Sequence, residues 1–406
     1  MPAITKNAIV QMFNRRFVDI QAELPELSAA GYSYILVSPP QRSHPSEEWW
    51  GRYQPVDFTI IDGPLGTGND LRTLCAVAAD HGIRVLVDAV LNHMANHGDY
   101  VQRAADGRLL SIQFPRYSRQ DFHDPGCNGD ICTWLGGLPD LRTESRHVRD
   151  EARAYVRRLV DEFGVAGFRF DAARHVEPGF FTYILSRTNG LFCFGEFVVN
   201  HPDAVSQDYL QVMDAYDFPL ASTLRQAFGW GGDLRLLTSP AQYGRAFTGV
   251  SAVTFVRHHD IVHHPDWFTE YAMSSEIDRR LAYAFILGRR EGTPFVYLDD
   301  RFEPTIRAGL RFHNLALGKD EYSVVAEQSQ LVLRRGDDQL CAINKSGESW
   351  QLPENPGLRD GPYVECVGGG QCQVQQGRLT GFTLAPSSAA FLIPQGAAGG
   401  ASGGNA

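Results

Sequence analysis

Acidic side chains follow several apolar runs of this chain, in positions from which they could share one cavity. Arg169 and Asp171 stand at the end of one run, and Glu196 ends the next. A later run leads into His259 and Asp260. Three carboxylates around a small cavity suit the cleavage of a glycosidic bond, because one ionised carboxylate can attack the anomeric carbon while a protonated one gives its proton to the leaving oxygen. Burial and like charges would keep the acid protonated, and an arginine beside the nucleophile would keep it ionised and aimed.

A plainer interpretation applies to each of these residues taken singly. Aspartate and asparagine are common helix N-caps, and arginine with aspartate forms ordinary surface ion pairs. The pattern recurs, however, at another apolar run, which ends at Asp88 and continues into Asn92 and His93. Its repetition on successive runs favours a shared site over independent caps.

The elements that must position these residues are short apolar runs separated by amphipathic helical patterns. Such runs occupy residues 7–13, 34–38, 84–88, 167–171, 191–196, 252–255 and 294–297, with helical patterns near 19–30, 70–81 and 151–163. Near-continuous apolar strands between helices indicate a parallel sheet covered on both faces. Up to eight units over about 310 residues predict an α/β fold of the (β/α)8 TIM-barrel type, whose active sites lie at the strands' carboxyl ends. A doubly wound sheet would place a glycine-rich loop where this chain has NRRFVD.

Two regions interrupt the alternation and divide the chain into domains. Residues 94–140 have no clear period and are too long for an ordinary loop, which predicts a short excursion domain B after strand 3. The catalytic barrel, domain A, would then comprise residues 1–93 and 141–312. Short alternating runs predict a C-terminal antiparallel β-sandwich, domain C, over residues 313–395, and the glycine-rich residues 396–406 predict a flexible tail.

The overall composition excludes several classes of partner. With 406 residues, 43% hydrophobic and 21% charged, the chain resembles ordinary globular proteins with a large core. Its net charge of −10 argues against nucleic acid, which needs clustered lysine and arginine. No apolar run approaches the roughly 18 residues of a membrane span, and the first residues lack a signal-peptide pattern. We expect a monomer without a membrane partner, cytoplasmic as the chain stands or, alternatively, secreted with its signal removed.

The seven cysteines do not form a zinc-binding pattern. Cys127 with Cys132, and Cys366 with Cys372, are close enough in sequence for each pair to close a small loop. Cys75 and Cys193 lie in apolar surroundings and are predicted to be buried thiols.

Six segments of the chain carry a resemblance to a known family. They are WWGRYQPVDF (49–58), DAVLNH (88–93), LPDL (138–141), GFRFDAARH (167–175), GEF (195–197) and FVRHHD (255–260). In this order and spacing the segments resemble the motifs of the α-amylase family of retaining glycoside hydrolases, glycoside hydrolase family 13. The first segment is similar to animal-type and related bacterial members. The resemblance covers about residues 7–312.

The resemblance implies a role for each matching residue. Asp171 would be the nucleophile, Glu196 the general acid/base and Asp260 the stabiliser of the transition state. The substrate-binding set that it implies comprises Tyr53, Trp49, Trp50, Gln54, His93, Arg169, Arg174, His175 and His259. For the two tryptophans the alternative is core packing, since aromatic side chains fill cores as readily as they bind sugars.

A structural Ca²⁺ ion is also implied by the resemblance. Its ligands would be Asn92, Asp140 and the backbone carbonyl of His175, and an all-oxygen set suits this hard cation. A further ligand would come from the loop between Cys127 and Cys132, around Asp130. The alternative is that Asn92 and Asp140 only cap turns.

The sequence departs from the family pattern at three positions. Arg174 stands where the family usually has lysine, which keeps the charge but changes reach and hydrogen-bond geometry. His258 replaces an asparagine that helps to bind chloride in some members, which argues against a chloride requirement even though Arg169 is present. Arg257 and the wording FVRHHD also resemble sucrose-active relatives such as amylosucrase, although this chain is much shorter.

The residues and the resemblance together lead to three hypotheses. The first is an α-amylase that cleaves internal α-1,4-glucosidic bonds of starch, glycogen or maltodextrins with retention, through a covalent glucosyl-enzyme intermediate. The second is an α-glucosidase, transglycosylase or sucrose-active enzyme of the same family. The third is a non-catalytic binding protein on the same fold, which predicts loss of at least one of the three carboxylates. All three carboxylates are present, so an α-glucan is the expected partner.

Overall fold

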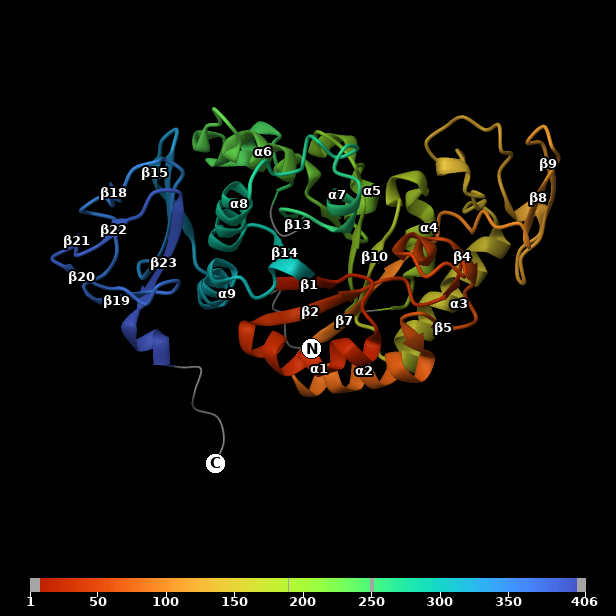
Figure 1. The fold of residues 1–406 in the computed structure, drawn as a ribbon, viewed down its shortest axis with the longest axis horizontal. Helices are drawn as coiled ribbons and strands as arrows, with labels where there is room; N and C mark the ends of the chain where they lie inside the picture. Colours follow the sequence, from red (N-terminus) through yellow and green to blue (C-terminus); the bar gives the residue numbers. More distant parts are fainter. Residues whose placement is uncertain (1–7, 189, 249–251, 400–406) are drawn as a thin grey trace.

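The computed structural model describes residues 8–188, 190–248 and 252–399, and its centre is a closed barrel of parallel strands (Figure 1). Around the barrel the strand order is β1-β14-β13-β12-β11-β10-β7-β2. These strands are β1 (Ala8–Met12), β2 (Tyr32–Val37), β7 (Arg84–Ala89), β10 (Gly167–Phe170), β11 (Phe192–Gly195), β12 (Asp214–Tyr216), β13 (Ala252–Phe255) and β14 (Thr293–Tyr297). The predicted TIM barrel is therefore confirmed.

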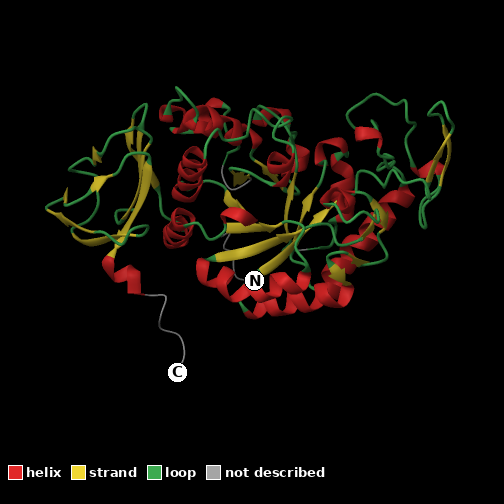
Figure 2. Cartoon of the chain, in the orientation of Figure 1, coloured by secondary structure: helices red, strands yellow, loops and turns green. Residues whose placement is uncertain are grey.

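Helices cover the outside of the barrel (Figure 2). They are α1 (Phe17–Ala30), α2 (Gly68–Asp80), α3 (Arg146–Phe163), α4 (Pro178–Ile184), α5 (Gln207–Leu210), α6 (Phe218–Phe228), α7 (His259–His263), α8 (Glu276–Gly288) and α9 (Pro304–Ala316). Local sequence fixes several of their ends. Thr67 and Asp70 form a capping box at the start of α2, and α3 begins at the N-cap Ser145 and ends at Gly164 in the left-handed conformation.

One barrel strand gave no clear signal in the sequence. β12 is only three residues long, and its first residue, Asp214, is charged. Within the described residues its pairing is short as well, because two register pairs join it to β13, Ala215 with Ala252 and Tyr216 with Val253. The barrel thus closes through a strand too short to show a pattern of its own.

Residues 94–140 leave the barrel after its third strand, β7. Within them lie the antiparallel pair β8 (Val101–Arg103) and β9 (Leu109–Ile112), and Cys127 forms a disulfide with Cys132. Phe114, Tyr117 and Phe122 pack together beside them as a small aromatic core. The domain boundaries drawn from the sequence stay a prediction.

An antiparallel seven-stranded sheet follows α9, in the order β15-β16-β17-β23-β19-β20-β21, and a separate β18-β22 pair lies beside it. The strands are β15 (Glu321–Ala326), β16 (Gln330–Arg335), β17 (Gln339–Asn344), β18 (Trp350–Gln351), β19 (Gly361–Glu365), β20 (Gln371–Gln375), β21 (Arg378–Thr380), β22 (Thr383–Leu384) and β23 (Ser388–Pro394). Figure 1 shows this region at one end of the molecule, against α8 and α9. The predicted antiparallel C-terminal fold is confirmed.

The sheet approaches α8 and α9 closely because glycines face it. A Cβ atom on Gly288 would lie 2.5 Å from the sulfur of Cys341, and one on Gly309 would lie 3.0 Å from the ring of Phe391. Glycine is therefore required at this interface. Beyond the sheet, Gln395–Gly399 forms a 3-10 helix where a flexible tail was predicted, and residues 400–406 lie outside the described part.

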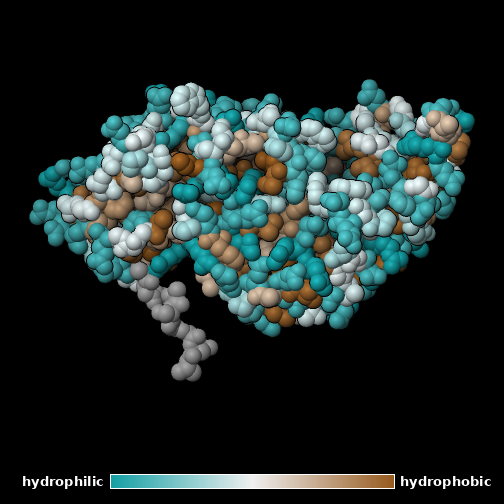
Figure 3. All heavy atoms as spheres, in the orientation of Figure 1, coloured by the Kyte–Doolittle hydropathy of each residue, from teal (hydrophilic) through white to brown (hydrophobic). Residues whose placement is uncertain are grey.

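The remaining predictions concern cysteines and the surface. Cys75 and Cys193 are buried free thiols, as predicted, whereas Cys366 and Cys372 are both free and do not close a loop. Hydrophobic residues on the face drawn in Figure 3 are interspersed with hydrophilic ones. Among the described helices, none combines the length and apolar character needed to cross a membrane.

Candidate active site

A cavity of about 580 Å³ opens at the carboxyl ends of the barrel strands. The nucleophile predicted from the sequence follows β10, the predicted acid follows β11, and the third carboxylate lies in the first turn of α7 after β13. Of the predicted site residues, those lining the cavity are Trp49, Trp50, Tyr53, Gln54, His93, Asp171, Arg174, His175, Glu196 and Asp260. Arg169 and His259 lie beneath them, fully buried.

Arg169 joins the acidic groups of the site. One terminal nitrogen, Nη1, lies 2.8 Å from Asp88 Oδ1 and 2.6 Å from Asp171 Oδ1. The other, Nη2, lies 2.8 Å from Glu196 Oε1 and 4.0 Å from Asp260 Oδ2. The side chain has no exposed surface, so these carboxylates share one desolvated positive charge.

Burial and neighbouring charges shift the pKa values of two carboxylates, Glu196 and Asp260, in opposite directions. Burial, together with the charges of Asp171 and Asp260, raises the pKa of Glu196 to about 8 despite the nearby Arg169. For Asp260 burial acts in the same direction, but the neighbouring His259 and His258 imidazoles and Arg169 outweigh it and hold the pKa below its ordinary value. One carboxyl is thus kept protonated near neutral pH beside another that is kept ionised, as acid catalysis next to a developing positive charge requires.

Asp171 and Glu196 are also held by backbone contacts at a strained turn. The amide of Asp171 donates to the carbonyl of Ala89, and the amide of Glu196 to the carbonyl of Phe170, so each continues the ladder of the barrel by one residue. Ala172 adopts the left-handed conformation, with φ of 48°. Its amide donates to Glu196 Oε2 at 3.0 Å, which ties Glu196 to the residue after Asp171.

Tyr53 and His93 form one wall of the cavity. The hydroxyl of Tyr53 donates to Asp88 Oδ2 at 2.8 Å, and burial raises the pKa of Asp88 to about 7. His93 Nε2 lies 2.9 Å from the carbonyl oxygen of Tyr53, and the ring of His259 stacks on Tyr53 with centroids 4.9 Å apart. The tyrosine is therefore held at its hydroxyl, at its backbone and on one ring face.

Gln11 is a site residue that the sequence did not reveal. Its amide nitrogen lies 2.9 Å from His259 Nδ1, and its carbonyl oxygen accepts from the backbone amide of His259 at 3.2 Å. With Nδ1 accepting, the proton of the neutral ring is on Nε2, which lies 3.3 Å from Asp260 Oδ2. Gln11 is on β1, and no motif marks it.

His258, His259 and Asp260 form the one group of acidic, histidine or cysteine side chains in the described part of the chain with spacing that could hold a metal. Burial lowers the pKa of both imidazoles, so both are neutral at neutral pH. The guanidinium of Arg169 lies 4.0 Å from the carboxylate of this group, and its charge disfavours a cation there. The group is better explained as the support of Asp260.

Further aromatic and basic side chains line the cavity. Trp50 is 38% exposed, which excludes the core-packing alternative for this tryptophan, and Trp49 stacks on His263 at 4.9 Å. Arg174, which also lines the cavity, donates to the carbonyl of Val198 at 3.2 Å and lies 3.6 Å from Asp130. Trp267, which sequence analysis missed, also lines the cavity and is 79% exposed. An isolated exposed tryptophan in an irregular segment gives no pattern that could predict it.

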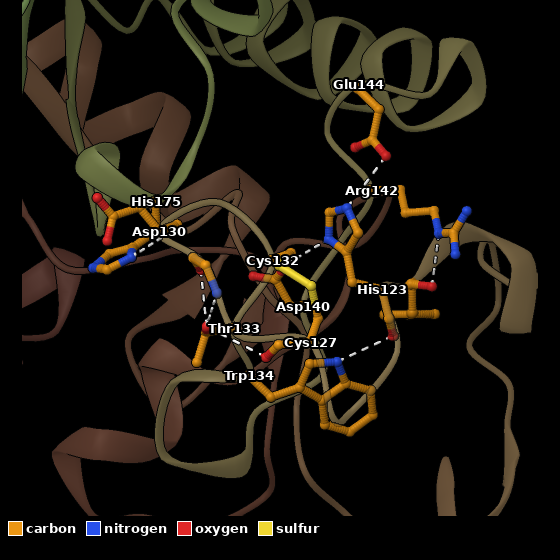
Figure 4. Close-up of a disulfide and its surroundings, with 12 residues drawn as sticks. His123, Cys127, Asp130, Cys132, Thr133, Trp134, Asp140, Arg142, Glu144 and His175 are labelled. Carbon is orange, nitrogen blue, oxygen red and sulfur yellow. Dashed lines mark hydrogen bonds and ion pairs between the residues drawn. A yellow bond between two sulfur atoms is a disulfide. The ribbon is translucent and has the colours of Figure 1, made fainter.

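Three residues of the proposed Ca²⁺ site, Asp130, Asp140 and His175, lie around the disulfide loop (Figure 4). Asp140 is 1% exposed, and its Oδ2 atom contacts His123 Nδ1 at 2.7 Å. Its Oδ1 atom is buried without a hydrogen-bond partner. His175 Nδ1 lies 2.7 Å from the carbonyl oxygen of Asp130, which joins the disulfide loop to the turn after β10. A buried, unpartnered carboxylate oxygen fits a hard cation.

Comparison with known proteins identifies the family. The profile described as "Alpha amylase, catalytic domain" matches residues 20–215. An α-amylase from Aeromonas hydrophila is 33% identical over 402 residues, covering 85% of each chain. The chain belongs to the α-amylase family. It is therefore a glycoside hydrolase, and the resemblance read from the six motifs is confirmed.

Two further α-amylases show how far the likeness extends. Pancreatic α-amylase 2a5 of Mus musculus is 36% identical over 207 residues, which cover 46% of this chain and 40% of that protein. The solved structure of α-amylase I from Eisenia fetida superposes with a TM-score of 0.84 at 22% identity, covering 95% of this chain and 97% of the other. At that identity the structural likeness concerns the fold alone. The fold shared with this α-amylase spans barrel and C-terminal sheet together.

Proposed function

We propose that this α-amylase family enzyme cleaves internal α-1,4-glucosidic bonds of starch, glycogen or maltodextrins with retention of configuration. The observation that carries the proposal is the contact of Asp171 and Glu196 with the two terminal nitrogens of one buried arginine. That arrangement favours the close carboxylate pair of a retaining enzyme over a pair separated by a water molecule.

In the first step Asp171 attacks the anomeric carbon, and the bond to the leaving oxygen breaks as that oxygen takes the proton of Glu196. The product is a glucosyl ester of Asp171 and a free reducing-side fragment. In the second step Glu196, now ionised, removes a proton from water, which displaces Asp171 and restores both groups. Asp260, kept ionised, would stabilise the positive charge on the sugar ring in both transition states.

The shape of the site supports action within a chain. The cavity has exposed aromatic side chains, Trp50 and Trp267, so sugars can extend beyond the reacting bond. A variant of Eisenia fetida α-amylase I, which superposes with a TM-score of 0.80 at 21% identity, was solved in complex with maltohexaose. By analogy, an α-glucan of several units is the proposed substrate.

Arg257, one of the residues that resembled sucrose-active relatives, has a structural explanation. Arg257 forms two 2.7 Å hydrogen bonds to Asp300, which also pairs with Arg279 at 3.2 Å. This arginine does not line the cavity. Its presence in FVRHHD is therefore accounted for by an ion-pair network on the barrel rather than by a sugar contact.

Ca²⁺ is proposed as a structural ion held by Asn92, Asp140 and the carbonyl of His175, with the carbonyl of Asp130 as a further ligand. The ion would supply charge that holds the excursion region against the barrel. The disulfide between Cys127 and Cys132 favours the secreted alternative over the cytoplasmic one, since disulfides persist in oxidising compartments.

Chromatography of the first products from maltoheptaose tests the proposal. The wild-type enzyme is expected to release fragments of intermediate length, whereas an α-glucosidase would release glucose first. Asp171→Asn, which keeps the shape of the side chain, is the control for hydrolysis by this site. Intact starch and maltoheptaose beside consumed sucrose would exclude the proposed substrate.

A further inference from the structure

The disulfide loop, residues 127–132, touches two side chains of the active-site cavity through one of its residues, Asp130 (Figure 4). The carbonyl oxygen of Asp130 lies 2.7 Å from His175 Nδ1, and because a carbonyl can only accept, the ring donates to it. The carboxylate of Asp130 lies 3.6 Å from Arg174 Nη2. His175 and Arg174 both line the cavity, whereas Asp130 does not. Any effect of Asp130 on a bound ligand therefore passes through these two side chains.

Arg174 is held at three of its atoms. Its backbone amide donates to the carbonyl of Glu196 at 3.3 Å, and Nη1 donates to the carbonyl of Val198 at 3.2 Å. Among the described residues, Asp130 is the one acidic group within ion-pair distance of the guanidinium. The side chain of Arg174 is 47% exposed, so without this pair its free end would gain rotamers. The loop thus restricts a cationic side chain that a ligand meets in the cavity.

The disulfide fixes the position of Asp130 in the loop. The bond between Cys127 and Cys132 closes the chain on both sides of this residue, and Thr133 Oγ1 accepts from the amide of Gly129 at 3.0 Å. The loop lies outside the helices and strands, and the side chain of Asp130 is 73% exposed. Covalent closure, rather than burial of Asp130, therefore keeps the loop against the cavity residues.

We propose that Asp130 is a positioning residue for substrate binding, and that the disulfide between Cys127 and Cys132 keeps it in place. Its carboxylate holds Arg174 at the cavity, and its carbonyl orients the ring of His175. Affinity for the substrate then depends on the oxidation state of the cysteine pair. This inference rests on the proposed function, since it assigns both cavity side chains to the binding of an α-glucan.

Asp130→Asn removes the charge and keeps the size of the side chain, the carbonyl and the disulfide. We expect KM for maltoheptaose to rise about threefold, within the range of an exposed ion pair, with kcat unchanged. Because the glucan is uncharged, salt acts on the pair alone: KM of the wild type should rise with ionic strength at constant chloride, and that of Asp130→Asn should not. Asp130→Glu, which keeps the charge, should restore most of the affinity. A lowered melting temperature with KM and its salt response unchanged would reduce Asp130 to a structural role and overturn the inference.

Arg174→Gln completes a double-mutant cycle with Asp130→Asn. In the Arg174→Gln background, Asp130→Asn should raise KM no further, because the pair is already broken. Asp124→Asn is the matched control, since Asp124 is 70% exposed and pairs with Arg119 just before the loop, outside the active-site cavity. Its KM should equal that of the wild type. Additive effects of Asp130→Asn and Arg174→Gln, or an equal rise of KM in Asp124→Asn, would overturn the inference.

Reduction of the disulfide tests the second part of the proposal. Dithiothreitol passes two electrons and two protons to Cys127 and Cys132 and becomes a cyclic disulfide. The remaining cysteines are free thiols, so the reagent acts on this bond alone. Below the melting transition and in excess Ca²⁺, reduction should raise KM at least as far as Asp130→Asn does, because both contacts of Asp130 are released.

The double variant Cys127→Ser, Cys132→Ser should have this raised KM with and without the reagent. An unchanged KM in the reduced wild type would overturn the inference. A wild type inactive on maltoheptaose in both oxidation states would instead overturn the proposed function.

Discussion

At the scale of single residues, the chemistry depends on how charge is shared around Arg169. Four carboxylates lie within 4.0 Å of one guanidinium, so the ionisation of each depends on the others. Glu196 is buried beside the charges of Asp171 and Asp260, whereas Asp260 has two imidazoles beside it. Neighbours therefore decide which carboxyl gives a proton.

The pKa of Glu196, about 8, predicts a basic limit of activity. In the proposed mechanism the leaving group departs with the proton of this side chain, so kcat/KM should fall as pH rises through about 8. Glu196→Gln should lower kcat by about 10²–10⁴-fold, the usual contribution of a general acid. It should also abolish the basic limb of the pH profile, the fall in kcat/KM at high pH. Rates on maltotetraose across pH check both. An unchanged basic limb in Glu196→Gln would mean that another group supplies the proton.

The raised pKa of Glu196 also predicts how the stability of the folded protein changes with pH. A carboxyl with a folded-state pKa raised above its unfolded value binds its proton more tightly in the folded protein. Its stabilisation is complete below the unfolded pKa and is lost as pH rises through the folded one. Between about pH 5 and 8 the melting temperature of Glu196→Gln should therefore fall less than that of the wild type.

Gln11 is expected to set the tautomer of His259. In Gln11→Glu the shape is kept, but a carboxylate can only accept a hydrogen bond, so His259 would move its proton to Nδ1 and lose the one that faces Asp260. We expect kcat to fall at least about tenfold with KM little changed. The wrong tautomer of His259 weakens interactions made in the transition state more than it weakens substrate binding. Steady-state kinetics of Gln11→Glu and Gln11→Leu measure the effect. A rise in KM alone would assign Gln11 to substrate binding.

At the scale of elements, strand ends explain which site residues could be predicted. Asp88, Asp171 and Glu196 end apolar runs, and in a parallel barrel all such ends meet at one rim. Gln11 gave no signal because its partner His259 is 248 residues away, and only closure of the barrel between β1 and β14 brings them together. β12 was missed for a different reason, since three residues are too few to show a period.

The disulfide loop of the excursion region gives a prediction at the same scale. Closing a loop of this length stabilises by about 2 kcal/mol through the unfolded state. The double variant Cys127→Ser, Cys132→Ser should melt at a lower temperature and be cut more readily by protease within residues 124–137. Thermal melts with and without reductant measure this. Reductant should not affect the double variant, and a wild type insensitive to reductant would contradict the prediction.

At the scale of the whole molecule, the C-terminal sheet and the barrel are packed as one core. Phe391 of β23 is fully buried, with its ring 5.2 Å from that of Phe312 in α9. Phe391→Ala should lower the free energy of unfolding by about 3–5 kcal/mol through the cavity that it leaves. Urea unfolding measures the loss, with Tyr322→Ala, at an exposed side chain, as control. Turnover below the transition should stay normal, because Phe391 does not line the active-site cavity.

Ca²⁺ would link the excursion region to the barrel, so its removal should lower the thermal stability of the whole molecule. A ligand bound only by the folded state stabilises it by about 2.7 kcal/mol at 100 times its Kd. Excess EGTA should therefore lower the melting temperature, and added Ca²⁺ should restore it. In Asp140→Asn, which loses the charge of the buried carboxylate, EGTA should have no effect. His123→Ala, which leaves Asp140 but removes its 2.7 Å contact, should need more Ca²⁺ for the same stabilisation, because a hydrogen bond that orients the carboxylate is lost. A wild type that melts at one temperature in EGTA and in Ca²⁺ would show that the His123 contact alone satisfies Asp140.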